Sequence, residues 1–148
     1  MRKVAAIHDL SCYGRCSLAV ILPVLSVMGV QCCPLPGTVL STHTGGFGAV
    51  QRTDLTHQVA GTLRRWERLG LGFDGIYTGY MASAEQIFQA VEAVERLSAP
   101  HAQVVVDPVL GDHGRLYTSI TQEMAQAMGQ LCAKARVITP NLTEAAIL

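Results

Sequence analysis

Short apolar runs alternate with longer segments of helical periodicity along most of the chain. The runs that predict strands cover residues 4–7, 30–35, 38–41, 75–78, 104–106 and 136–139. Between them, apolar residues recur at helical spacing and predict helices over residues 16–28, 55–69, 83–97 and 121–131. This alternation predicts an α/β fold with an open, mostly parallel sheet and helices on both faces.

Capping and breaking residues support several of these boundaries. Asp54 and Gly70 stand where a helix over 55–69 should begin and end. Ser83 and Gln86 have the spacing of a capping box for the next helix. Pro23 is expected to bend the first helix, which Gly29 should end. Pro34 and Pro36 are expected to divide residues 30–41 into two separate strands.

The last residues of the chain predict a further helix. Asn141 and Glu144 have capping-box spacing, and an apolar segment follows as far as Leu148. A helix of this kind needs a partner surface. We therefore expect residues 1–148 to be the N-terminal portion of a single domain in a longer protein.

Composition excludes several classes of partner. The chain has 148 residues, with 11 basic and 11 acidic side chains and no basic cluster, so nucleic acid and anionic membranes are not expected partners. The longest uncharged apolar stretch, residues 18–30, is too short to cross a bilayer. The five cysteines are odd in number and contain no C-x-x-C spacing, which favours reduced thiols in a cytoplasmic protein.

Polar residues follow most of the predicted strands. The carboxyl ends of parallel strands form the ligand-binding edge of an open α/β sheet, so a small polar ligand is expected there. The residues concerned are Asp9, the turn 42–46, the segment 78–80, Asp107, Asp112, and Thr139 to Asn141.

Each candidate also has a structural interpretation. Asp107, Asp112 and Glu144 could hold a Mg²⁺ that bridges phosphates, because Mg²⁺ needs few carboxylates and keeps several waters. Asp107 could equally cap a turn before Pro108, and the capping box alone accounts for Asn141 and Glu144. Thr44, Gly45 and Gly46 could approach a ligand or form an ordinary glycine turn, and Tyr80 could stack on a ring or simply be buried.

Five motifs, in this order along the chain, resemble those of the pyridoxal (vitamin B6) kinases of the ribokinase-like superfamily. They are Ile7-His8-Asp9-Leu10-Ser11-Cys12-Tyr13-Gly14, Ser41-Thr42-His43-Thr44-Gly45, Tyr77-Thr78-Gly79-Tyr80, Asp107-Pro108-Val109-Leu110-Gly111-Asp112, and Ile138-Thr139-Pro140-Asn141-Leu142-Thr143-Glu144. The last two motifs are shared more widely among ribokinase-like vitamin kinases, and the second points most narrowly to the B6 branch.

The resemblance implies a three-layer fold and ATP- and Mg²⁺-dependent phosphorylation of the hydroxymethyl group of pyridoxal, pyridoxine or pyridoxamine. By motif, Asp9, Thr44 and Gly45 would contact the polar edge of the pyridine ring, and Tyr80 would flank it. The residues implied for ATP are Asp107, Asp112, Thr139, Asn141 and Glu144, of which Asp107, Asp112 and Glu144 would serve the metal. In-line transfer, controlled by positioning and charge neutralisation, and a homodimer are also implied.

Two departures from the family pattern leave alternatives open. Pyridoxal kinases usually have serine where this chain has Asp9. An acid there resembles the hydroxymethylpyrimidine kinases of thiamin synthesis, which are the alternative assignment. The G-x-G-D element that supplies the catalytic base and oxyanion-hole amides is absent, so the base is expected beyond Leu148.

The nearest match to that element, residues 70–74, precedes a strand and should lie at the opposite edge of the sheet. We therefore expect the 148-residue chain alone to be inactive. A truncated remnant that only binds a ligand or partner is a third possibility.

Overall fold

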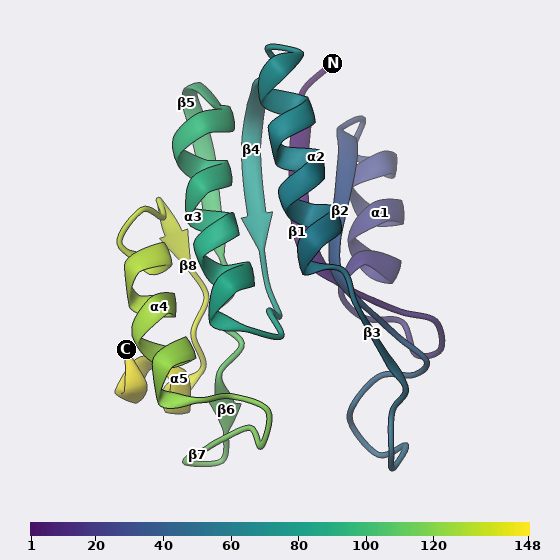
Figure 1. The fold of residues 1–148 in the computed structure, drawn as a ribbon, viewed down its shortest axis with the longest axis vertical. Helices are drawn as coiled ribbons and strands as arrows, with labels where there is room; N and C mark the ends of the chain where they lie inside the picture. The colour runs from purple at the N-terminus through teal and green to yellow at the C-terminus, as the bar shows by residue number, and fades with distance from the viewer.

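A six-stranded sheet organises the molecule, in the strand order β3-β2-β1-β4-β5-β8. The computed structural model describes residues 1–148, and its elements appear in Figure 1. They are β1 (Lys3–Ser11), α1 (Leu18–Val27), β2 (Gln31–Leu40), β3 (Arg52–Asp54), α2 (Thr56–Arg68), β4 (Phe73–Thr78), α3 (Ala84–Leu97), β5 (Ser98–Val106), β6 (Gly111–Asp112), β7 (Arg115–Leu116), α4 (Gln122–Cys132), β8 (Val137–Ile138) and α5 (Leu142–Ile147).

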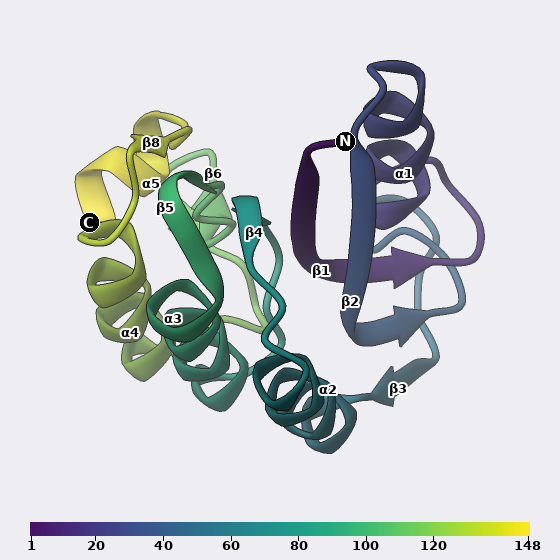
Figure 2. The same ribbon diagram turned by 90° about the horizontal axis from the view of Figure 1, so that it is seen from above.

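The predicted fold class is confirmed. β1, β2, β4, β5 and β8 run parallel, and β3 pairs antiparallel with β2 at one edge. Helices α2, α3 and α4 cover one face of the sheet, while α1 and α5 lie on the other (Figure 2). The molecule is therefore a three-layer α/β structure. None of its helices has both the length and the apolar character needed to cross a bilayer.

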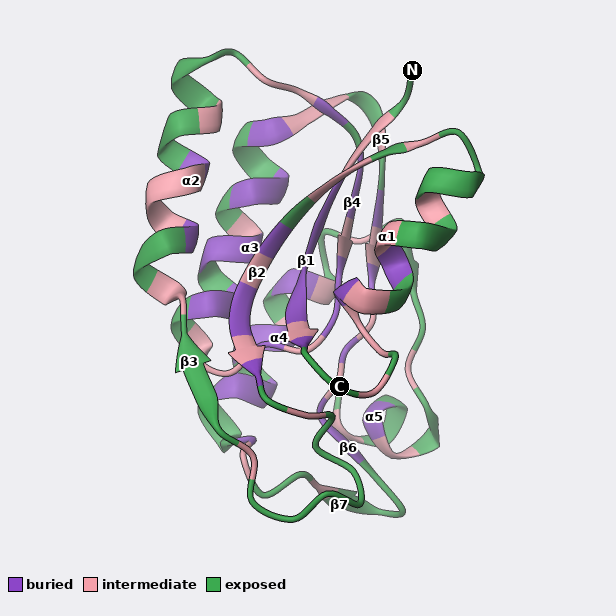
Figure 3. Cartoon of the chain, turned by 90° about the vertical axis from the view of Figure 1, so that its right-hand side faces the viewer, coloured by how far each residue is buried: buried purple, intermediate pink, exposed green.

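The two faces of the sheet are buried to very different extents. Under α2, α3 and α4, 22 buried apolar residues form one continuous core. On the α1 side the buried cluster contains Ala6, Leu18 and Ile21. Figure 3 shows the same contrast, because α3 and α4 carry many buried positions and α1 is largely exposed or intermediate. Most of the hydrophobic stabilisation therefore comes from one side.

The prediction of two separate strands over residues 30–41 is wrong. β2 is continuous through both prolines, with a register shift against β1 between His8 and Asp9. Pro34 and Pro36 have the same parity, so their nitrogens face the same side of the strand. That side is open, because β3 reaches only residues 38–40 of β2, so the missing N–H groups cost no ladder bonds.

Most of the predicted helix boundaries are reproduced. Gly70 has a φ of 64°, and the amides of Gly70 and Leu71 donate to the carbonyls of Glu67 and Trp66, which is a Schellman ending for α2. Asp54 accepts from the Thr56 amide at 2.8 Å just before α2 begins.

The Ser83–Gln86 capping box is only half formed. Ser83 Oγ accepts from the Gln86 amide at 3.2 Å, but the Gln86 side chain is used elsewhere. Pattern analysis missed β3 and the β6–β7 hairpin, whose strands have two or three residues. It also made β1 too short, since Asp9 lies within the strand and does not follow it.

Candidate functional site

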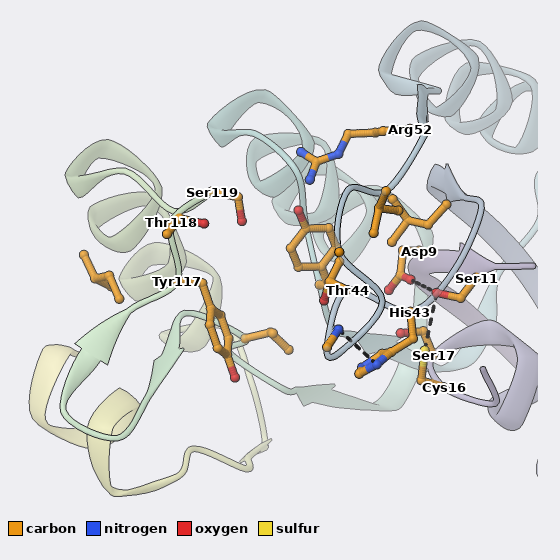
Figure 4. Close-up of a pocket in the computed structure, with 17 residues that line it drawn as sticks. Asp9, Ser11, Cys16, Ser17, His43, Thr44, Arg52, Tyr117, Thr118 and Ser119 are labelled. Carbon is orange, nitrogen blue, oxygen red and sulfur yellow. Dashed lines mark hydrogen bonds between the residues drawn. The ribbon is translucent and has the colours of Figure 1, made fainter. Parts of the chain in front are cut away.

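A cavity of about 660 Å³ lies at the carboxyl edge of the parallel strands (Figure 4). Its walls come from the end of β1, the loops after β2, β4 and β5, and the first residues before α1. All four residues predicted to contact the substrate, Asp9, Thr44, Gly45 and Tyr80, line it. The structure therefore brings together groups that are up to 71 positions apart in the sequence.

Asp9 lies near the end of β1, in one wall of the cavity, and is held there by a hydrogen bond. It is only 3% exposed, and its Oδ2 accepts a hydrogen bond from Ser11 Oγ at 3.2 Å. Ser11 Oγ in turn accepts from Cys16 Sγ at 3.4 Å. This chain of donors holds the carboxylate and connects β1 to the segment that enters α1.

The turn over residues 42–48 forms a second wall and is tied to the first. The His43 amide donates to the Tyr13 carbonyl at 2.7 Å, and the rings of Tyr13 and Phe47 meet edge to face at 5.6 Å. Gly45 donates to His43 Nδ1 at 3.2 Å, and a Cβ at Gly45 would come within 2.8 Å of the imidazole. A larger residue at position 45 would therefore have to displace the exposed imidazole of His43.

Tyr80 enters the cavity from the loop after β4. Its hydroxyl and the hydroxyl of Thr78 are buried without a hydrogen-bond partner. Such groups carry a desolvation cost until something pairs with them. The Tyr80 hydroxyl thus lacks a protein partner beside the cavity.

Four of the five residues predicted for ATP lie in one group beside β5 and α5. Asp107 Oδ1 accepts from Thr139 Oγ1 at 3.3 Å, and Asn141 Nδ2 donates to the Gly111 carbonyl at 2.9 Å. Glu144 is 4% exposed and accepts from the amides of Asn141 at 2.9 Å and Leu110 at 3.1 Å. With the Glu144 amide donating to Asn141 Oδ1, the capping box is complete.

Asp112 lies apart from this hydrogen-bonded group. It is exposed on the β6–β7 hairpin, where Oδ1 accepts from the His113 amide at 2.7 Å and Oδ2 is 3.5 Å from His113 Nε2. No set of three or more His, Cys, Asp or Glu side chains in the molecule is arranged to hold a metal ion. Asp107, Asp112 and Glu144 therefore do not form a ready-made three-carboxylate site.

Negative potential nevertheless gathers here. Burial raises the pKa of Asp107, the charge of Glu144 raises it further, and the Thr139 hydroxyl opposes both effects. Burial also raises the pKa of Tyr117, with further contributions from Asp112, Glu144 and Asp107. A divalent cation at Asp107 would relieve this repulsion, and one carboxylate with waters and phosphates is a sufficient Mg²⁺ environment.

Sequence reasoning missed several residues of the cavity wall. Arg52 stands on the short strand β3, which no apolar pattern marks, and Tyr117, Thr118 and Ser119 belong to the segment after the hairpin. The sequence predicts Ser11 in a loop over residues 9–15 and Cys16 at the start of the next helix, but nothing in it shows that the two form a hydrogen-bonded chain to Asp9. Folding alone brings these residues to the cavity.

This sheet order, its helical layers and the polar cavity at the carboxyl edge define a ribokinase-like kinase fold. The sequence profile of the phosphomethylpyrimidine kinase family matches residues 24–148. The chain therefore belongs to the pyridoxal kinase/phosphomethylpyrimidine kinase family.

Three solved structures illustrate the relationship. A Bacteroides thetaiotaomicron protein assigned as a phosphomethylpyrimidine kinase, crystallised with pyridoxal, is 47% identical with a TM-score of 0.93, and the match covers 99% of this chain and 51% of that one. The pyridoxal kinase of Lactobacillus plantarum is 39% identical with a TM-score of 0.95, and the match covers 100% of this chain and 52% of that one. The pyridoxal kinase of Leishmania donovani, in complex with ADP and pyridoxamine, is 26% identical with a TM-score of 0.78, and the match covers 100% of this chain and 52% of that one.

The chain spans about half the length of the curated relatives that it matches. It covers 52% of the Pasteurella multocida pyridoxal kinase, for example, at 29% identity.

Proposed function

We propose that this chain is the N-terminal portion of a kinase domain that phosphorylates the hydroxymethyl group of pyridoxal, pyridoxine or pyridoxamine with ATP. The carrying observation is that Asp9, Thr44, Gly45 and Tyr80 line one cavity at the carboxyl edge. Relatives with 47% and 26% identity hold pyridoxal, or pyridoxamine with ADP. In this proposal Asp9 and the 44–45 turn contact the polar edge of the ring, and Tyr80 flanks its face.

The nucleotide is proposed to lie beside the group of Asp107, Thr139, Asn141 and Glu144, with Asp112 on the adjacent hairpin. Asp107 is the residue best suited to Mg²⁺, because its carboxylate is half-buried and repelled by Glu144. Bound Mg²⁺ would neutralise charge on the phosphates. Direct ligation by Asp112 and Glu144 stays a prediction, since the two carboxylate oxygens of Glu144 already accept amide hydrogens.

The catalytic base is proposed to lie outside residues 1–148. The segment over residues 70–74 cannot replace the missing element, because it leads into β4 and Asp74 accepts from the Lys3 amide at 2.8 Å at the amino edge of the sheet. What this chain provides is therefore orientation of the vitamer, a nucleotide-side wall, and an acidic group for the metal.

A hydroxymethylpyrimidine is the second candidate substrate. Two observations favour it: the matched family profile, and the carboxylate of Asp9 at the ring-binding wall. A carboxylate can accept from an exocyclic amine or pair with a protonated ring nitrogen, so Asp9 alone is compatible with both ligands.

Binding and turnover distinguish the candidates. We expect pyridoxal and pyridoxamine to bind the 148-residue chain in calorimetric titrations, and to be phosphorylated in a coupled ADP-release assay by the longer protein that we propose. Turnover of the hydroxymethylpyrimidine alone would contradict the B6 assignment.

We also propose that the protein self-associates through α1, in line with the homodimer implied by the family resemblance. The helix contains no charged residue, and Val24, Val27 and Met28 are exposed on or just after it. An uncharged apolar face does not repel a second copy of itself, as an isologous contact requires. Sedimentation over a range of concentrations tests this: a monomer at all concentrations would contradict it.

A further inference from the structure

The cavity carries opposite charges on two of its walls. The lining residues include one carboxylate side chain, that of Asp9, and one guanidinium, that of Arg52, together with the imidazole of His43. Asp9 is buried at the end of β1, whereas Arg52 is the first residue of β3. Figure 4 shows the Arg52 guanidinium extending from its strand toward the wall that carries Ser119, with Asp9 on the side of Ser11.

The backbone of Arg52 is held while its side chain has no partner. Arg52 pairs with Leu40 across the β2–β3 ladder, and Ser41 and Gln51 exchange two hydrogen bonds of 3.0 and 3.1 Å next to it. The ion pairs of the molecule involve Arg96, His113 and Lys134, and no hydrogen bond uses the Arg52 guanidinium. Arg52 is exposed, so its five N–H donors face the cavity and solvent without an acceptor from the protein.

The ring of a B6 vitamer has chemistry that matches two opposite charges. It is a 3-hydroxypyridine, in which the hydroxyl is acidic and the ring nitrogen is basic. Transfer of the hydroxyl proton to the nitrogen gives a dipolar ring with a cationic N–H and an anionic oxygen, with no net change in charge. The aminopyrimidine ring of a hydroxymethylpyrimidine has no ring hydroxyl and cannot form this oxyanion.

We propose that Asp9 and Arg52 select the dipolar form of the B6 ring, with the ring N–H⁺ facing Asp9 and the 3-oxyanion facing Arg52. The inference rests on the proposed function and deepens it, because it makes Arg52 a residue that determines specificity for B6 vitamers. A ring turned over about the axis through its nitrogen would carry the oxyanion away from Arg52, and a ring with its oxyanion facing Asp9 would bring like charges together. The two charges therefore also fix the orientation of the ring. In that orientation the 5-hydroxymethyl group points away from Arg52.

The test compares pyridoxine with 3-deoxypyridoxine, which lacks the ring hydroxyl. Both are titrated into the wild-type chain, Arg52→Gln, Arg52→Lys, and the control Arg68→Gln on the exposed surface of α2. We expect the wild type and the control to bind pyridoxine about tenfold more tightly than the deoxy compound, as for one charge-assisted hydrogen bond. In Arg52→Gln the two affinities should become equal through weaker binding of pyridoxine alone, and Arg52→Lys should restore part of the difference.

Absorbance gives a second readout, because the dipolar ring absorbs at longer wavelength than the uncharged ring. Pyridoxine bound to the wild type should show the dipolar band, and pyridoxine bound to Arg52→Gln should show less of it. Circular dichroism checks that each variant is folded, and if Arg52→Gln is not, the comparison of Arg52→Lys with wild type decides.

Four outcomes would overturn the inference. Equal affinity of the wild type for the two compounds would contradict the oxyanion contact, and so would an equal weakening of both in Arg52→Gln. Either result would leave the proposed function intact. Weaker binding of ATP with unchanged binding of pyridoxine would assign Arg52 to the nucleotide. Failure of both compounds to bind any variant would contradict the proposed function as well.

Discussion

His8 is a buried imidazole next to the proposed ligand-binding carboxylate. It is 3% exposed, its ring meets Tyr77 edge to face at 4.5 Å, and a Cβ at Gly79 would collide with its Nδ1. Burial lowers the pKa of His8 to about 4 from 6.5, although a hydrogen bond with the Tyr77 backbone acts in the opposite direction. The imidazole is therefore neutral in the folded chain at neutral pH.

This low pKa predicts a loss of stability in acid. Between pH 6.5 and 4 the unfolded chain binds a proton at this position and the folded chain does not, so the free energy of unfolding should fall as the pH decreases. The full effect is on the order of 3 kcal/mol. Urea unfolding at several pH values should show that the free energy of unfolding changes less steeply with pH in His8→Asn than in wild type. His57→Asn, at an exposed position of α2, is the control, and equal slopes for His8→Asn and wild type would contradict the prediction.

Asp107 is predicted to serve function at the expense of stability. Since burial and Glu144 both raise its pKa, the charged carboxylate is unfavourable in the free protein. Asp107→Asn should therefore raise the melting temperature at neutral pH, and the amide can still accept from Thr139 Oγ1. In the longer protein, the same change should lower kcat/KM for Mg·ATP on the order of a hundredfold, comparable to the loss of one transition-state donor. An unchanged kcat/KM would leave Asp107 with a structural role only.

Among the elements, α3 is joined through Gln86 to three segments that lead to the cavity. Gln86 is 2% exposed, and its Oε1 accepts from the Ala82 amide at 2.9 Å. Its Nε2 donates to the Gly37 carbonyl and to Thr56 Oγ1, both at 2.9 Å. One amide thus joins α3 to the bulge in β2, to the start of α2, and to the loop that follows Tyr80.

Gln86→Met should cost about 2–3 kcal/mol of stability, because the buried Gly37 carbonyl loses its donor and the partly buried Ala82 amide loses its acceptor. It should also raise the dissociation constant of the vitamer, since the loops on both sides of the cavity lose a common anchor. Gln89→Met on the same helix is the matched control: Gln89 makes one hydrogen bond, at 3.1 Å to the Thr56 carbonyl, and its Oε1 is already unpaired. Equal losses in chemical denaturation of the two variants would contradict this account of Gln86.

The contrast between Gln86 and Glu144 shows what the sequence could predict. Both stand at the N3 position expected of a capping box, and Glu144 makes that contact while Gln86 does not. The difference comes from Gly37, 49 positions earlier, whose carbonyl faces Gln86. Periodicity and caps depend on neighbours within a turn, so they locate helices and strands well. Contacts such as this one depend on tertiary packing, which no local pattern records.

The candidate site shows the same contrast between local patterns, which the sequence reveals, and tertiary contacts, which it does not. Asp9, Thr44, Gly45 and Tyr80 could be predicted to converge, because each follows or ends a strand and parallel strands share one carboxyl edge. Arg52 could not, since β3 is three residues long and has no apolar pattern. The surroundings of Asp112 could not be predicted either, because the hairpin over residues 111–116 places its carboxylate beside His113.

At the scale of the whole molecule, we predict that residues 1–148 alone do not transfer phosphate. The acids at the carboxyl edge are already committed: Asp9 to Ser11, Asp107 to Thr139, and Glu144 to two amides. No further carboxylate lines the cavity to accept the proton of the attacking hydroxyl. Vitamer-dependent ADP release by this chain should therefore fall far below that of the longer protein. A gap of less than about tenfold, or 1.4 kcal/mol in the barrier, would show that the base lies within these residues.

The unequal burial on the two faces of the sheet has a consequence for motion. α1 is held by a small apolar cluster, so its detachment should require much less free energy than global unfolding. The residues just before it, Cys16 and Ser17, belong to the cavity wall. At concentrations where the chain is monomeric, amide hydrogens of α1 should then exchange with solvent deuterium well before those of α3, and a bound vitamer should slow the α1 amides selectively. The α1 side of the cavity would therefore open and close by local unfolding, while the side supported by α2, α3 and α4 stays fixed.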